Sequence, residues 1–99
     1  MSPKQIQSIK GTHDILPDQS WKWRQLETSL HNFMSLYGYR EIRTPAFEET
    51  ELFSRSVGED TDIVSKEMYS WMDQGGTHLT LKPELTAPVV RSFIQHNLQ

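Results

Sequence analysis

The segment Leu79–Pro88 constrains the fold of this chain more than any other. Apolar and polar residues alternate at its start, as in a β-strand, and Pro83 ends the alternation because proline has no amide proton for a sheet ladder. Thr86 is a residue type that commonly begins helices, and a proline two residues later fits a first helical turn. We therefore predict a strand that leads through Glu84 into a helix beginning near Thr86.

The carboxylate of Glu84 is the group in this segment with the most chemistry to offer. It precedes the predicted helix start, where unpaired backbone amides create a positive field that favours the charged form. A carboxylate so placed can accept charge-assisted hydrogen bonds from an ammonium group, and the Thr86 hydroxyl can add a neutral acceptor. An ordinary helix cap explains the same residues, and residue types alone favour the cap, because such caps occur at most helices.

A long helix is predicted from Asp18, as its N-cap, to Tyr37, with Gly38 as the left-handed residue that ends it. Its apolar residues recur at spacings of three and four and form one stripe. The stripe consists of Trp23, Leu26, Leu30, Phe33, Met34 and Tyr37. Trp21 lies off the stripe, so the helix offers additional aromatic surface to a partner subunit.

The remaining elements are predicted to be short. They are strands at Gln5–Lys10 and Tyr39–Thr44, the second ended by Pro45; a helix at Glu51–Val57 closed by Gly58; an acidic loop at Glu59–Ser65; and a hairpin formed by Glu67–Asp73 and Thr77–Leu81 around Gln74-Gly75-Gly76. The last helix is expected to turn Val89, Val90, Phe93, Ile94 and Leu98 inward, and we find no stop signal for it before Gln99.

Composition excludes several classes of function. The net charge of -3 argues against a domain whose main task is to grip phosphate backbones, and the absence of cysteine excludes thiolate chemistry and disulfides. The sequence contains neither a secretory h-region nor an apolar run of membrane-spanning length, so we expect a cytoplasmic protein without membrane contact. The four histidines do not have the spacing of a metal site. Two groups of carboxylates, Glu48, Glu49 and Glu51 and then Glu59, Asp60 and Asp62, are interpreted as acidic surface, so no metal site is expected.

Four segments in order resemble the N-terminal part of the histidyl-tRNA synthetase family. They are Lys10-Gly11-Thr12-His13-Asp14-Ile15-Leu16-Pro17; Gly38-Tyr39-Arg40-Glu41-Ile42-Arg43-Thr44-Pro45 with Phe47-Glu48; Val57-Gly58-Glu59-Asp60-Thr61-Asp62-Ile63-Val64 with Lys66-Glu67-Met68-Tyr69; and Leu81-Lys82-Pro83-Glu84-Leu85-Thr86-Ala87. One such segment would be a weak signal, whereas four in the right order are a strong one.

This resemblance implies an α+β fold of the class II aminoacyl-tRNA synthetase type, an antiparallel sheet flanked by helices, which is incomplete in residues 1–99. Motif 1 of the family would cover about residues 19–47 and form a homodimer interface. The amino-acid pocket would begin at about residues 79–87. There Glu84 and Thr86 match the family residues that hold the α-amino group of histidine, and Leu85 would line the floor between them.

The resemblance also implies an activity for the full-length parent. Such a parent activates histidine with ATP and Mg²⁺ to histidyl-adenylate and transfers the histidine to tRNA(His). The family arginines that grip the ATP phosphates lie downstream of Gln99, so residues 1–99 are expected to be inactive alone, with no catalytic or cofactor-binding residue identifiable in them. Lys82 and Leu85 depart from the family, which commonly has Arg and Gly there; the lysine keeps the charge but loses the planar fork.

Two other functions are consistent with these residues. A regulatory subunit of ATP phosphoribosyltransferase resembles the synthetases and senses histidine without aminoacylation; the sequence after Gln99 would distinguish it from a ligase. A module that only dimerises is the third alternative. The Lys-Pro-Glu-x-Thr pattern and the long match to motif 1 favour the ligase.

Overall fold

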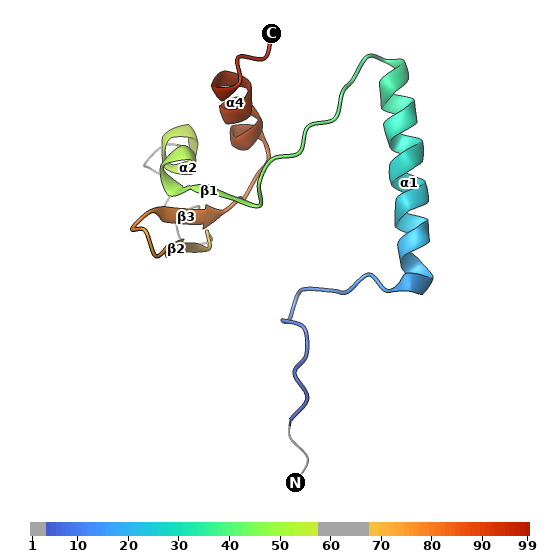
Figure 1. Ribbon diagram of the computed structural model, residues 1–99, viewed down its shortest axis with the longest axis horizontal. Coiled ribbons are helices and arrows are strands. Elements are labelled where there is room, and N and C mark those ends of the chain that lie inside the picture. The colour runs from blue at the N-terminus through green and yellow to red at the C-terminus, as the bar shows by residue number, and fades with distance from the viewer. Residues whose placement is uncertain (1–3, 58–67) are drawn as a thin grey trace. The chain divides into compact units, whose positions relative to one another are not determined.

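The computed structural model describes residues 4–57 and 68–99, and in it the chain forms two units, Met1–Glu41 and Ile42–Gln99. The predicted cap at Gly58, the acidic loop Glu59–Ser65 and the first residue of the predicted hairpin, Glu67, lie outside the described residues. Helix α1 (Pro17–Leu36) is the regular element of the first unit (Figure 1). The second unit contains β1 (Phe47–Glu49), α2 (Thr50–Val57), β2 (Ser70–Met72), β3 (His78–Leu81) and α4 (Thr86–Gln95).

Helix α1 confirms the predicted long helix but begins earlier than expected. Its N-cap is Leu16, which has no capping side chain, and Asp18 lies in the first turn instead of capping it. Pro17 opens the helix because its φ is already helical and its missing amide would have been unpaired there. At the other end Gly38 has φ +81°, and the amides of Gly38 and Tyr39 donate to Ser35 and Met34, which is the Schellman arrangement.

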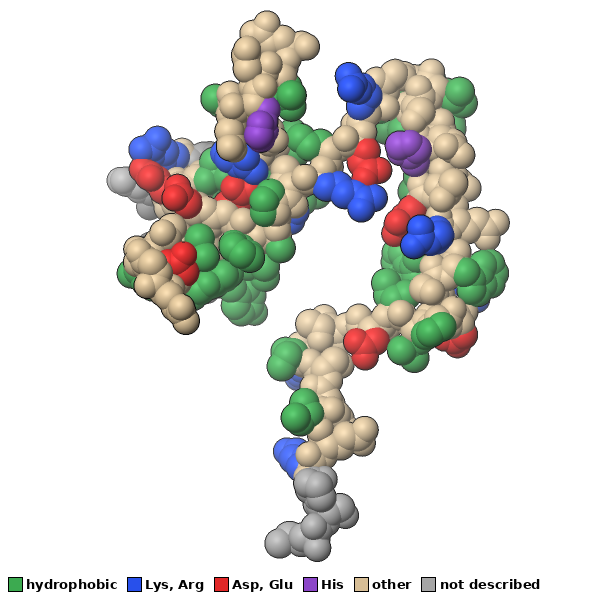
Figure 2. Space-filling view, in the orientation of Figure 1, with side chains coloured by type: hydrophobic (Ala, Val, Ile, Leu, Met, Phe, Trp, Pro, Cys, Tyr) green, Lys and Arg blue, Asp and Glu red, His purple; other side chains and the backbone are tan. Residues whose placement is uncertain are grey.

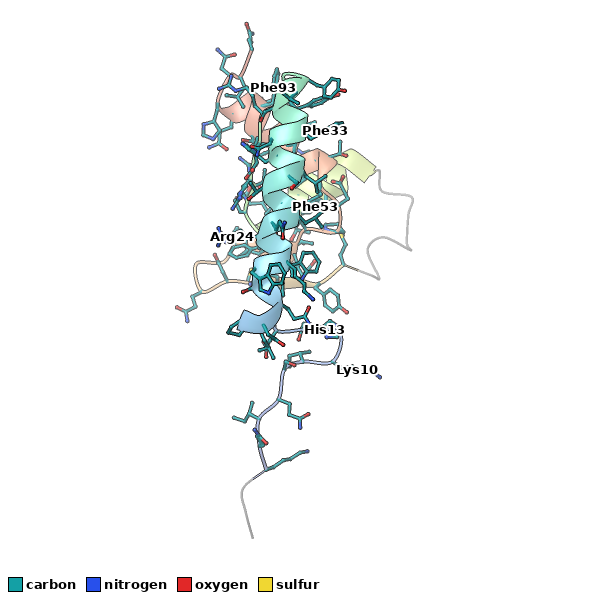
Figure 3. All side chains as sticks on the ribbon, turned by 90° about the vertical axis from the view of Figure 1, so that its right-hand side faces the viewer. Lys10, His13, Arg24, Phe33, Phe53 and Phe93 are labelled. Atoms are coloured by element: carbon teal, nitrogen blue, oxygen red, sulfur yellow. The ribbon has the colours of Figure 1, made fainter. Side chains whose placement is uncertain are left out.

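The apolar stripe of α1 is exposed within its own unit. No residue of the helix is buried, and the stripe side chains from Trp23 to Tyr37 are between 41% and 68% exposed. Phe33 and Tyr37 contact each other with ring centroids 5.2 Å apart. Phe33 is labelled on α1 in Figure 3, as are Lys10 and His13 on the irregular segment before it. The strand predicted at Gln5–Lys10 is absent from residues 4–10; a turn closed by the Thr12 amide on the Ile9 carbonyl follows instead.

The second unit is built on an antiparallel sheet with strand order β1-β3-β2 (Figure 1). The hairpin prediction is confirmed for its described part, Met68–Asp73 with Thr77–Leu81. Asp73 closes its turn, since its backbone amide donates to Thr77 and its side chain accepts the Thr77 amide, while Gly76 has φ +85°. The strand predicted at Tyr39–Thr44 is wrong: this segment pairs with no described strand, and the ladder starts at Phe47.

Helix α2 contacts β1, β3 and α4 and supplies the centre of the core. Phe53 on α2 is 1% exposed, and Pro88 and Ala87 in the first turn of α4 are also buried. Thr80 on the central strand is fully buried, and its hydroxyl bonds the hydroxyls of Thr50 and Ser70, each at 2.8 Å. The face of the sheet with Thr80 is therefore the one that the helices cover.

The opposite face of the sheet is apolar and partly exposed. Register places Phe47 opposite Leu81, and Leu79 opposite Trp71, and the Phe47 and Trp71 rings meet edge to face with centroids 5.6 Å apart. Phe47, Trp71 and Leu81 remain 41% to 47% exposed. Figure 2 shows hydrophobic side chains gathered over the sheet on the side away from α4.

Helix α4 begins at Thr86 as predicted, but the expected inward face is wrong. Val89, Val90, Phe93, Ile94 and Leu98 are all between 38% and 71% exposed, because the described unit offers only one small sheet and α2 to pack against. The helix also has a stop signal that sequence reading missed. Asn97 adopts φ 51°, and the amides of Asn97 and Leu98 donate to Ile94 and Phe93, so the helix ends in a second Schellman arrangement.

Candidate functional site

The carboxylate of Glu84 lies at the start of α4. One of its oxygens, Oε2, accepts the backbone amide of Thr86 at 2.8 Å, and the other, Oε1, accepts the amide of Ala87 at 2.9 Å. Each carboxylate oxygen has two lone pairs, so each keeps the capacity for a further donor. The side chain is half-buried. The cap that residue types favour is therefore present, and it leaves the carboxylate able to accept an external ammonium.

Thr86 and Leu85 flank this carboxylate differently from a simple N-cap. The N-cap position is Leu85, and Thr86 is the first helical residue, so the Thr86 backbone, rather than its hydroxyl, serves the cap. Thr86 is exposed, and Leu85 is 65% exposed. Both side chains are accessible to a ligand that reaches Glu84.

Strand β1 holds the chain on the strand side of Glu84. Beyond the last pair of the ladder, the Lys82 amide donates to the Ala46 carbonyl at 3.0 Å. The Lys82 ammonium lies 3.4 Å from both the carbonyl and the hydroxyl oxygen of Thr44. Lys82 is thus turned toward the segment before β1 and bonds backbone and hydroxyl oxygens there.

The helix side of Glu84 is held to the same strand by an ion pair. Arg91 on α4 binds Glu48 on β1 through two parallel hydrogen bonds, Nε to Oε1 and Nη2 to Oε2, both 2.9 Å long. Arg91 Nη1 also donates to Gln95 at 2.6 Å. The side chains of Arg91 and Glu48 are only 26% and 9% exposed. The interpretation of Glu48 as acidic surface is therefore wrong, because the carboxylate is buried against a guanidinium from another element.

A hollow of about 490 Å³ lies beside this ion pair. It is lined by Arg43, Thr44, Pro45, Glu48, Glu49, Leu52, Arg91, Ser92, Gln95 and His96. Glu84, Leu85 and Thr86 are not among its lining residues. The hollow and the start of α4 are thus separate features of the second unit.

Metal ligands and membrane spans were also sought. Within residues 4–57 and 68–99, no three histidine, aspartate or glutamate side chains gather closely enough to hold a metal ion. Among the helices of these same residues, none combines the length and the apolar character that crossing a bilayer requires.

The comparisons with known proteins agree with this geometry. A small antiparallel sheet flanked by helices, with a carboxylate at the strand-to-helix junction, is an incomplete α+β fold of the class II aminoacyl-tRNA synthetase type. The histidyl-tRNA synthetase family model matches residues 11–99, and the chain belongs to this family.

Individual relatives show how much of a longer protein the chain represents. It is 58% identical over 94 residues to the histidine–tRNA ligase of Staphylococcus epidermidis, which covers 95% of the chain but only 22% of that relative. The apo histidyl-tRNA synthetase of S. aureus has a TM-score of 0.79 and 47% identity over 96% of the chain and 22% of its own. A Bacillus halodurans structure described as an ATP phosphoribosyltransferase regulatory subunit/histidyl-tRNA synthetase has a TM-score of 0.72 and 25% identity, covering 99% of the chain and 25% of its own. The chain thus spans about a fifth of the length of these ligases.

Proposed function

We propose that residues 1–99 are the N-terminal part of the catalytic domain of a histidine–tRNA ligase, with motif 1 at about residues 19–47 and the amino-acid pocket beginning at about residues 79–87. The complete enzyme would activate histidine with ATP to histidyl-adenylate and transfer the histidine to tRNA(His). Membership of the family and 58% identity to a protein named histidine–tRNA ligase support this proposal. We expect the complete enzyme to work in the cytoplasm.

The role proposed for Glu84 is to bind the α-ammonium group of histidine. The observation that carries it is the pair of amide bonds from Thr86 and Ala87, which fix the carboxylate while leaving a lone pair on each oxygen. A preorganised carboxylate binds a cation well because it does not have to be reorganised when the cation arrives. The exposed Thr86 hydroxyl would add a neutral acceptor, and Leu85 would line the floor of the pocket.

Holding the ammonium orients the other end of histidine for the reaction. A carboxylate oxygen of histidine would attack the α-phosphorus of ATP, and pyrophosphate would leave. The negative charge that develops on the phosphates requires cations such as arginine and Mg²⁺. We assign no residue of this chain to ATP or Mg²⁺; those groups would come from the remaining length of the enzyme, and the 99 residues alone are expected to be inactive.

We also propose that the exposed stripe of α1 forms the homodimer interface. The stripe is aromatic, continuous along one helix and at least 41% exposed at every position. Exposed apolar patches of this kind are typical of subunit interfaces. A regulatory role in histidine sensing is the alternative, and the 25% identity to the Bacillus halodurans protein supports it less than the identity to the ligases supports catalysis.

Histidine-dependent pyrophosphate exchange tests the proposed function. The experiment uses the full-length ligase, by which we mean a protein of the relatives' length that contains this chain. Glu84→Gln, which removes the charge but keeps an acceptor, should cost about 2 kcal/mol in use of histidine, roughly 30-fold. Glu51→Gln is the matched control, because Glu51 is an exposed carboxylate bonded to Arg55 in α2. Unchanged exchange kinetics in Glu84→Gln would remove this carboxylate from the site.

A further inference from the structure

We infer that Arg91 and Glu48 are a positioning pair that fixes the carboxylate of Glu84, and with it the α-ammonium group of the amino acid. This inference rests on the proposed function of Glu84 and extends it to two residues that contact no substrate. It starts from the position of Glu84 between two attachments to the same strand, β1.

The first attachment precedes Glu84 in the chain. Strand β3 pairs with β1 up to Leu81, and the Lys82 amide continues the ladder to Ala46. The backbone entering the Pro83-Glu84 junction is therefore fixed by hydrogen bonds. These bonds define where Glu84 begins but leave open the direction in which α4 departs.

The second attachment follows Glu84 and fixes that direction. Arg91 is rigidly bonded, since its guanidinium forms two parallel 2.9 Å bonds to Glu48 and a third, of 2.6 Å, to Gln95. A planar fork of this kind defines an orientation as well as a distance, which a lysine ammonium would not. Because Glu48 lies opposite Thr80 of β3 in the sheet register, both attachments belong to one rigid ladder.

The Glu84 carboxylate depends on that direction. Its oxygens are held by the amides of Thr86 and Ala87, which belong to the first turn of α4. A tilt of α4 would move these amides and would carry the carboxylate with them. The ion pair is well placed to prevent such a tilt, because it is largely buried and therefore less screened by solvent than a surface pair.

The test compares ligands that differ only in the group that Glu84 should bind. In the full-length ligase, Arg91→Lys keeps the positive charge and removes the fork. We expect it to weaken binding of histidine and of histidinol, which both carry the ammonium, by about tenfold, since small displacements of a binding group have effects of this order. Binding of imidazolepropionate, which lacks the ammonium, and the KM for ATP should change by less than about twofold.

Two further variants make the test specific. Arg55→Lys is the matched control, because Arg55 forms an exposed ion pair with Glu51 inside α2, and it should leave all ligands unaffected. In a Glu84→Gln background, Arg91→Lys should have no additional effect on histidine, because residues that act through one another are not additive. Glu48→Asp retracts the carboxylate while keeping its charge and should show the same pattern as Arg91→Lys; it replaces Arg91→Lys if circular dichroism shows that variant to be unfolded.

The possible results separate the two proposals. An equal loss of imidazolepropionate and histidine binding in both Arg91→Lys and Glu48→Asp, or a full tenfold effect that persists in the Glu84→Gln background, would overturn the positioning role. A Glu84→Gln variant that binds histidine normally would instead overturn the proposed function of Glu84.

Discussion

Replacing the buried Thr80 by valine tests the packing of the sheet against its helices. Valine has nearly the same shape, so the change removes one hydroxyl from a site that is 0% exposed. That hydroxyl bonds Thr50 on α2 and Ser70 on β2, each at 2.8 Å. The substitution therefore breaks the polar connection among three elements without creating a cavity.

The expected loss follows from the exposure of the two partners. Each hydrogen bond contributes roughly 0.5–1.5 kcal/mol, and more is lost when a partner is left buried and unpaired. Ser70 is exposed and can bond water instead, whereas Thr50 is only half-exposed. We therefore expect Thr80→Val to lower the free energy of unfolding by about 1–2 kcal/mol. Ser70→Ala, which removes one bond at the exposed end, should cost about 0.5 kcal/mol.

Urea unfolding followed by far-ultraviolet circular dichroism measures these differences. For a small domain with a slope of about 1 kcal/mol/M, Thr80→Val should lower the midpoint by about 1–2 M. Ser54→Ala is the control, because its exposed hydroxyl bonds only the Thr50 carbonyl in its own helix, and it should change stability by less than about 0.5 kcal/mol. A Thr80→Val variant as stable as the original chain would refute the hydroxyl network.

Two further predictions concern α1. Gly38→Ala should lower the thermal stability of the helix end, at a cost of about 1–2 kcal/mol, because alanine is strained at φ +81°; no atom lies within 4 Å of the added methyl group, so a steric clash would not explain the loss, and amide exchange near residues 34–39 measures it. Leu30→Glu should shift the full-length ligase from dimer to monomer in sedimentation velocity, since it places a charge in the middle of the exposed stripe. Gln25→Glu, a charge change elsewhere on the same helix, is its control, and an undisturbed dimer in Leu30→Glu would contradict the interface proposal.

Sequence patterns predicted the elements whose signals are local. The helix stripe, the Gly38 termination and the Asp73–Thr77 turn all depend on residues close together in the chain, and the structure confirms them. Alternation also predicted β3, but alternation alone does not say which face is covered. The helices cover the face of Thr80, because hydroxyl and ion-pair partners await it there, while Leu81 stays partly exposed.

Features that join distant residues were not predictable in this way. Glu48 and Arg91 are 43 positions apart, so nothing local marks either as a member of a buried pair. Glu48 stands beside other carboxylates and was accordingly interpreted as surface. The predicted strand at Tyr39–Thr44 failed for a related reason: a strand needs a partner, and residue types do not reveal whether one is present. The inward face expected for α4 likewise depends on structure that the described unit does not supply.

A crystal structure of the full-length ligase with bound histidine tests the central claim most directly. The account predicts that the histidine α-ammonium nitrogen lies about 2.7–3.2 Å from a carboxylate oxygen of Glu84 while the amides of Thr86 and Ala87 keep their bonds to that carboxylate. Histidine bound with its ammonium on another acceptor, and Glu84 bonded to the two amides alone, would show that this carboxylate is a helix cap and nothing more.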